Sequence, residues 1–198
     1  MSRSASGGGL DDRRSQSGRS VTPGALLPLC LLAALVLCLC RSLDAADAEP
    51  LEYRVKAAFL LNFTKFIEWP PSSFSSADSP FDLCVMGEDP FGRALDELVE
   101  GETVNGRKLE VQRIRRDEAK NCQVLFIDNS EKEIPKILSG LGPGVLTVGE
   151  GDGFLRDGGI IGFVIQNRRV RFDINQSAAE AARLKISSKL LIVARNVR

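Results

Sequence analysis

The stretch FDLCVMGEDP, residues 81–90, decides the fold of this 198-residue chain. Its first six residues form a short apolar run, which predicts a buried β-strand. The last four residues predict a turn into a helix, with Asp89 as the N-cap and Pro90 at the first helical position. A buried strand followed directly by a helix is the repeating unit of an α/β fold, provided that the pattern recurs along the chain.

The pattern does recur on both sides of this stretch. Further strands are predicted over residues 109–114, 123–127 and 145–148, and an antiparallel hairpin over 160–165 and 169–174. Helices are predicted over residues 52–68, 130–138, 177–184 and 187–196, and a loop over 149–159. We therefore expect a single α/β domain over residues 49–198, with a six-stranded, mostly parallel sheet flanked by helices.

The first 48 residues have the organisation of a secretory signal peptide. An apolar run over residues 25–40 follows Arg13, Arg14 and Arg19 and precedes the small-x-small site Ala46-Asp47-Ala48. The run is shorter than the roughly 20 residues that a membrane-spanning helix needs. We expect cleavage after Ala48, export of residues 49–198 to the periplasm and no insertion of the mature chain into the membrane. The alternative is an uncleaved N-terminal anchor.

The composition of the mature chain argues against several classes of function. Residues 49–198 carry 21 Lys and Arg against 22 Asp and Glu, so their balance does not favour nucleic acid as a partner. Histidine is absent from the whole chain, and with it the usual general base and the commonest metal ligand. We expect neither an enzyme nor a protein with a metal or a cofactor.

Two of the five cysteines, Cys84 and Cys122, lie in the predicted mature chain. In an oxidising compartment such a pair favours one disulfide. Cys84 lies in the first predicted strand and Cys122 directly precedes the third, and these two strands are neighbours in a flavodoxin-like order. The bridge would then stabilise the fold by about 4 kcal/mol on the chain-entropy model. Two free buried thiols are the alternative, and a bridge could also have a regulatory role.

Three parts of the sequence resemble one known family. Residues 56–70, KAAFLLNFTKFIEWP, resemble the opening helix of the YfiR family of periplasmic regulators. Residues 158–161, 172–175 and 184–191 are similar to its closing pattern, and the strands at Cys84 and Cys122 to its middle. The resemblance implies a homodimer with a central disulfide. It also implies binding to the periplasmic domain of an inner-membrane diguanylate cyclase, with inhibition of the cyclase lowering cyclic di-GMP. A sensor kinase is the alternative partner.

Three side chains are candidates for partner binding. Phe154 and Leu155 lie in a glycine-rich segment where nothing local obliges burial, so Phe154 is either packed onto the core or an exposed anchor for a partner, and the second interpretation makes it a candidate. Trp69, the only tryptophan, ends the first predicted helix. Packing onto the core is the alternative for Phe154 and for Trp69. The alternative function is a periplasmic small-ligand receptor, for which the glycine-rich rim near Gly149 is the support.

Overall fold

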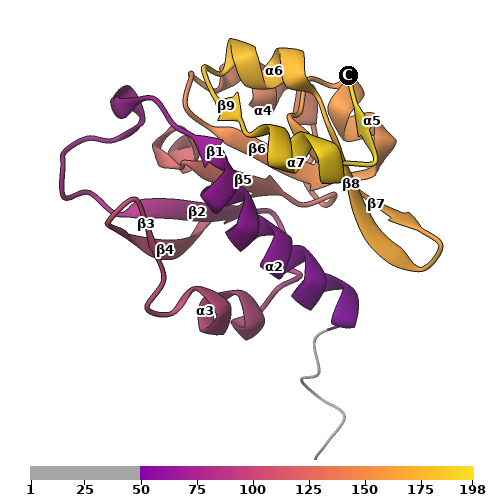
Figure 1. Ribbon diagram of the computed structural model, residues 1–198, viewed down its shortest axis with the longest axis horizontal. Helices are drawn as coiled ribbons and strands as arrows, with labels where there is room; N and C mark the ends of the chain where they lie inside the picture. Colours follow the sequence, from indigo (N-terminus) through magenta and orange to yellow (C-terminus); the bar gives the residue numbers. More distant parts are fainter. Residues whose placement is uncertain (1–49) are drawn as a thin grey trace, which may run out of the picture. The chain divides into compact units, whose positions relative to one another are not determined.

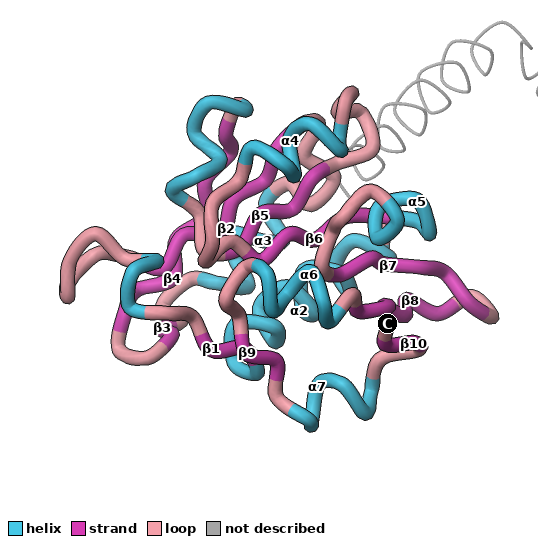
Figure 2. Tube along the Cα trace, turned by 90° about the horizontal axis from the view of Figure 1, so that it is seen from above, coloured by secondary structure: helices cyan, strands magenta, loops and turns pink. Residues whose placement is uncertain are grey.

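The structure is a computed structural model that describes residues 50–198, so the predicted signal peptide lies outside the described residues. The apolar run at residues 81–86 forms strand β2 (Phe81–Met86), with the bounds predicted for it. It lies inside a sheet that has helices on both faces (Figures 1 and 2). The predicted α/β class is confirmed.

Eight strands form this sheet, in the order β10-β8-β7-β6-β5-β2-β4-β3. Their bounds are β2 as above, β3 (Thr103–Val104), β4 (Arg107–Ile114), β5 (Val124–Ile127), β6 (Leu146–Glu150), β7 (Ile161–Gln166), β8 (Arg169–Ile174) and β10 (Asn196–Val197). The five strands β4, β2, β5, β6 and β7 are parallel and follow the flavodoxin-like order, whereas β8 is antiparallel to β7. The predicted count of six strands is wrong, because the two-residue strands β3 and β10 extend the sheet at its edges.

The helices form two layers. Their bounds are α2 (Leu51–Phe66), α3 (Arg93–Val99), α4 (Ile134–Gly140), α5 (Gly151–Arg156), α6 (Gln176–Ala181) and α7 (Ser188–Val193), with 3₁₀ turns η1 (Pro71–Ser73) and η2 (Arg116–Asn121). Side chains of α2, α3, α6 and α7 share one core cluster, whereas those of α4, α5 and η2 share another. Figure 2 shows α4 and α5 on the opposite side of the strands from α2 and α7. Both faces of the parallel strands are therefore covered, as their continuous apolar runs require.

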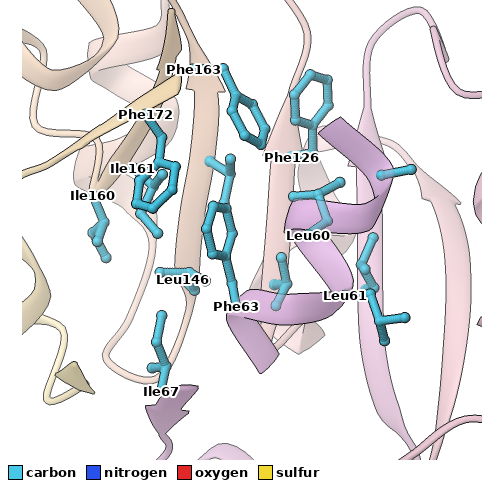
Figure 3. Packing of buried hydrophobic residues seen from close by; sticks show 14 of the residues in the cluster. Leu60, Leu61, Phe63, Ile67, Phe126, Leu146, Ile160, Ile161, Phe163 and Phe172 are labelled. Carbon is cyan, nitrogen blue, oxygen red and sulfur yellow. The ribbon is translucent and has the colours of Figure 1, made fainter. Parts of the chain in front are cut away.

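Aromatic rings of α2 fill the core between this helix and the hairpin of β7 and β8. The Phe63 ring lies 5.9 Å from the Phe163 ring and 5.1 Å from the Phe172 ring, measured between centroids (Figure 3). The Phe59 ring lies 5.4 Å from the Phe172 ring. Such pairs contribute about 0.5–1.5 kcal/mol beyond the burial of their area. They fix α2 across the strands that lead into the hairpin.

Two predicted helix starts are wrong. The helix after β2 begins at Arg93 rather than Pro90, and the Asp89 Oδ1 atom accepts a hydrogen bond from the Phe91 N–H at 2.8 Å instead of capping that helix. The helix after β5 begins at Ile134, and the Ser130 Oγ atom accepts a bond from the Glu88 N–H at 2.9 Å. In both cases the cap-forming side chain bonds a loop of the sheet edge, which competes with helix capping.

A second, two-stranded sheet lies outside the main one. Strand β1 (Ile67–Glu68) directly follows α2, and pairs antiparallel with β9 (Lys185–Ile186), which precedes α7. The first helix is thus shorter than predicted, since its last two predicted residues are extended. This pairing joins the end of α2 to the start of α7.

Candidate functional site: an apolar docking face

The large apolar side chains that stay exposed lie on four neighbouring elements. Within residues 50–198 they are Leu51, Val55 and Phe66 on α2, Ile165 on β7, Ile192 and Val193 on α7, and Val197 on β10. Helix α2 contacts both β8 and α7, and β8 pairs with both β7 and β10. We call these seven side chains the apolar face. Exposed apolar side chains gathered on adjacent elements are typical of an interaction surface.

The apolar face continues the core outward along α2. Leu51, Val55 and Phe59 are spaced by four residues, so they lie along one side of the helix. Phe59 is half-buried against the rings of the hairpin, whereas Val55 and Leu51 are exposed. On β7, Ile165 lies two residues beyond the buried Phe163 and on the same side of the strand. On both α2 and β7, apolar positions therefore extend from the buried core to exposed residues on the same side of the element.

Helix α7 presents the most exposed part of this face. The Ser187 Oγ atom caps the helix by accepting a bond from the Lys189 N–H at 3.3 Å. Leu190 is buried in the core, but Ile192 is 81% exposed and Val193 is 55% exposed. A run of four apolar residues in so short a helix cannot all face inward, because successive side chains point about 100° apart. Two aliphatic side chains are consequently left in solvent.

A buried ion pair fixes the first turns of α2 to the sheet. The Lys56 Nζ atom donates to Glu150 at 2.6 Å and also to Glu52, and it lies 4.3 Å from the centroid of the Tyr53 ring. Burial alone would lower the pKa of Lys56, but the hydrogen bonds to both carboxylates outweigh burial and raise it. Glu150 accepts a further bond from the Asn129 side chain at 3.3 Å. Glu150 ends β6, so the pair joins the helix of the apolar face to the carboxyl edge of the sheet.

A second ion pair fixes the segment that follows α7. The Arg195 guanidinium donates to both carboxylate oxygens of Asp173, at 2.7 and 2.5 Å. The Arg195 hydrogen bonds lower the pKa of Asp173. The Arg195 N–H also donates to the Phe172 carbonyl at 2.8 Å. These bonds lead the chain into β10, and they hold α7 beside the hairpin that carries Ile165.

The predicted disulfide is present in the structure. Cys84 on β2 and Cys122, two residues before β5, are bridged, and their Cα atoms lie 5.9 Å apart. Both cysteines are buried in the core cluster that α4 and α5 cover, on the face opposite α2. The bridge lies within the sheet layers and not on the apolar face.

The three predicted partner-binding side chains do not come together on the surface. Residues 149–159 contain helix α5 rather than only a loop, and Phe154 is 3% exposed there, with Leu155 also buried. Of the two interpretations of Phe154, packing onto the core is confirmed and the exposed anchor is wrong. Trp69 is half-buried: its Nε1–H donates to the Gln123 carbonyl at 3.0 Å and its ring packs edge-on against Phe81. A role of these three residues in partner binding stays a prediction.

Two glycines explain why Phe154 is buried. A Cβ atom added at Gly149 or at Gly159 would overlap the Phe154 ring, so the missing side chains form the slot that the ring occupies. The sequence signal for this arrangement is a pair of glycines ten residues apart with an aromatic residue between them. The glycines that predict a loop instead leave room for the Phe154 ring.

The Gly159→Ala variant is expected to lower the free energy of unfolding by about 2 kcal/mol, because the added methyl group overpacks the Phe154 slot. Denaturant unfolding of the purified variant measures this loss. Gly140→Ala is the matched control, since nothing lies within 4 Å of a Cβ atom at that position and it is the last residue of α4. Equal stability of the two variants would contradict the slot.

A largely polar pocket adjoins the apolar face at Phe66, which lines it. It has a volume of about 610 Å³ and opens beside the small β1–β9 sheet, where Lys65, Lys185 and Lys189 line it together with Ser187 and Asn105. At the carboxyl edge near Gly149, by contrast, Glu150 is already bonded to Lys56 and Asn129. Within residues 50–198, no group of three or more Cys, Asp or Glu side chains is arranged to hold a metal ion.

The comparisons with known proteins agree with the family expected from the sequence. A family model described as YfiR/HmsC-like matches residues 53–195. None of the curated proteins matches the chain. The fold is similar to the crystal structure of a conserved domain protein from Vibrio cholerae O1 biovar eltor str. N16961, with a TM-score of 0.50 and 11% sequence identity.

That structural match covers 77% of this chain and 62% of the other chain, and at 11% sequence identity it concerns the fold alone. Among the described residues, no helix has the length and apolar character needed to cross a membrane. The family model spans nearly all of the described residues, from Tyr53 in the first turn of α2 to Arg195, two residues after α7. On that match, the chain belongs to the YfiR/HmsC-like family.

Proposed function

We propose that this protein is an exported regulator that binds the periplasmic domain of an inner-membrane diguanylate cyclase and keeps the enzyme inactive, which lowers cyclic di-GMP in the cell. The family supports a regulator of this kind. The observation that carries the proposal is the apolar face: within residues 50–198, every exposed large apolar side chain lies on α2, α7, β7 or β10. The alternative partner is an inner-membrane sensor kinase, which the protein would bind in the same way.

The chemistry of the apolar face suits a protein partner. Ile192 and Val193 stand in solvent on a short helix that the core and the Asp173–Arg195 pair hold in place. Burying apolar area releases about 25 cal/mol per Å², and a few well-packed side chains dominate most interfaces. Binding would inhibit the cyclase if the apolar face fits the inactive conformation of the partner better than the active one.

The remaining parts of the proposal follow the family resemblance. The protein would act as a homodimer, without a cofactor and without catalysis of its own. The absence of histidine from the chain agrees with a role by contact. The Cys84–Cys122 bridge would form and persist in the oxidising periplasm, where we expect the protein to work.

The test is affinity capture from detergent-solubilised membranes, followed by mass spectrometry, together with the cyclic di-GMP level of the same cells. The wild-type protein should capture a diguanylate cyclase and lower cyclic di-GMP. The Ile192→Glu/Val193→Glu variant should capture at least about 30-fold less, because loss of one strong interface contact costs 2 kcal/mol or more. Cyclic di-GMP should then rise.

The matched control is Ser75→Glu/Ser139→Glu, which adds two carboxylates at exposed polar positions outside the apolar face. It should capture the partner as the wild type does. Recovery of a sensor kinase would keep the regulator and change its target. Recovery of no membrane signalling protein, with the same cyclic di-GMP level in the presence and absence of the protein, would rule the proposal out.

The second candidate function is a periplasmic small-ligand receptor. Its support in the structure is the pocket of about 610 Å³ beside β1 and β9. Lys65 pairs with Glu102 and Lys185 with Glu68, and Lys189 could bind an anionic ligand there. A ligand that binds only the folded protein raises its unfolding temperature. A panel of anionic metabolites in thermal unfolding separates this function from contact regulation alone. Both functions can coexist if a ligand controls release of the partner.

A further inference from the structure

The near-zero net charge hides an uneven distribution along the chain. Residues 151–198 carry nine Lys and Arg against four Asp and Glu, whereas residues 50–150 carry twelve against seventeen. Figure 1 shows α3, β2, β3 and β4 of the earlier part on the far side of the described unit from the projecting hairpin of β7 and β8, whereas α4 and β6 lie among the elements of the later part. The protein is therefore strongly polarised in charge.

Most cations of the later part have no ion pair within residues 50–198. Arg195 pairs with Asp173 and Asp152, and Lys185 pairs with Glu68. The other seven do not pair with a carboxylate of the described chain, and they are Arg156, Arg168, Arg169, Arg171, Arg183, Lys189 and Arg198. The positive charge of this region is thus left for an external partner.

Five of these arginines lie on and around the projecting hairpin. The strand register places Arg169 opposite Gln166 and Arg171 opposite Val164, so both project on one face of the hairpin. Arg168 lies at its tip in the left-handed region, with φ 59°. At the base of that face, Arg156, Arg198 and Val164 line a pocket of about 360 Å³. We call Arg156, Arg168, Arg169, Arg171 and Arg198 the basic surface.

We infer that the basic surface adsorbs the protein onto the anionic phospholipids of a membrane. The five cations are spread over a strand pair, a helix end and the chain terminus rather than gathered around one point, which suits a surface of many phosphates. Each guanidinium can bond a phosphate with two donors. Ile165, 53% exposed on the other side of the hairpin near its tip, adds an apolar group at the headgroup boundary.

The polarised charge also orients the protein at such a surface. A planar anionic layer attracts the basic end and repels the acidic one, although the described chain as a whole is almost neutral. The contact is peripheral and needs no membrane span. It is independent of the proposed regulatory partner, but it would hold the adjoining apolar face close to the membrane in which such a partner lies.

The test uses protein purified from the periplasmic fraction and sedimented with lipid vesicles at 50 mM salt. Vesicles of 70% phosphatidylcholine and 30% phosphatidylglycerol should bind it, whereas pure phosphatidylcholine should not. The Arg168→Gln/Arg169→Gln/Arg171→Gln variant should partition about 100-fold less, since each arginine near an anionic surface contributes about fivefold. Binding of the wild type should also fall as salt rises to 500 mM.

The matched control is Arg54→Gln/Lys120→Gln/Lys132→Gln, which removes three exposed cations from the acidic part of the chain. It should bind as the wild type does, and thermal unfolding should show both triple variants folded. Equal binding to the two vesicle types, or equal binding by the two triple variants, overturns the inference. A third outcome is that the vesicles bind neither the wild type nor the hairpin variant, and that in affinity capture from membranes only the hairpin variant loses a membrane protein. The basic surface would then be a contact for a protein, and the inference would be overturned. No regulatory partner is present in the vesicle assay, so its outcome is separate from that of the proposed function.

Discussion

Removing the Cys84–Cys122 bridge is expected to lower the free energy of unfolding by about 4 kcal/mol. The bridge spans 38 residues, and on the chain-entropy model a loop of this size restricts the unfolded state by about that amount. The Cys84→Ala/Cys122→Ala variant tests this by guanidinium unfolding. Alanine is preferable to serine because both positions are buried among apolar side chains, where a hydroxyl group would lack a partner.

Reduction of the wild type separates the cross-link from packing. Reduced wild-type protein keeps both sulfur atoms in the core, so it should lose the cross-link contribution but not the packing contribution. The m-value should rise in both cases, because an unbridged unfolded chain exposes more surface. A loss below about 1 kcal/mol on reduction would contradict the entropic role of the bridge.

The sheet was largely predictable because its strands are buried on both faces. Such strands are continuous apolar runs, and β2 keeps the bounds that its run predicts. Strands β3 and β10 were missed because each has two residues and lies at an edge of the sheet. β10 depends on long-range pairing with β8, which leaves no local pattern in the sequence.

Local signals failed where a side chain has a distant partner. Asp89 and Ser130 are ordinary helix caps by sequence, yet Asp89 bonds Arg113 and Ser130 bonds the loop after β2. The local signal at Phe154 is misleading for the same reason, since the slot between Gly149 and Gly159 exists only once α5 packs on β6 and β7. Tertiary contacts determine the conformation at these positions. The residues that make those contacts lie far apart in the sequence, so no local pattern indicates them.

The apolar face has a sequence signal that periodicity could have revealed. Leu190, Leu191, Ile192 and Val193 form an unbroken apolar run in a short helical stretch, and such a run exceeds what one helix face can bury. Leu190 takes the inward position, and the last two residues are left outside. The basic surface has no signal in the overall charge balance, because the excess of cations in residues 151–198 cancels the excess of carboxylates in residues 50–150.

Replacing Lys56 by methionine is expected to lower the free energy of unfolding by about 3 kcal/mol, the low end of the cost of removing one partner from a buried ion pair. Glu150, whose side chain is 15% exposed, would keep only the bond from Asn129. The carboxylate would then be desolvated without a cation, and α2 would lose its tie to β6. The unfolding midpoint in guanidinium measures the loss at pH 7.

A double-mutant cycle with Glu150→Gln identifies the pair as the cause. The Lys56→Met/Glu150→Gln variant should recover more than half of the loss, because the poorly solvated Glu150 charge is gone and the Glu52 side chain that remains is 41% exposed to water. The pKa of Lys56 is raised above its ordinary 10.5 in the folded protein, so the contribution is complete below that pH and is lost as the pH rises through the raised value. The difference between wild type and Lys56→Met should therefore stay constant from about pH 6 to 9 and shrink only above the ordinary lysine pKa. An additive double variant would mean that Lys56 acts through its packing against Tyr53 and not through its charge.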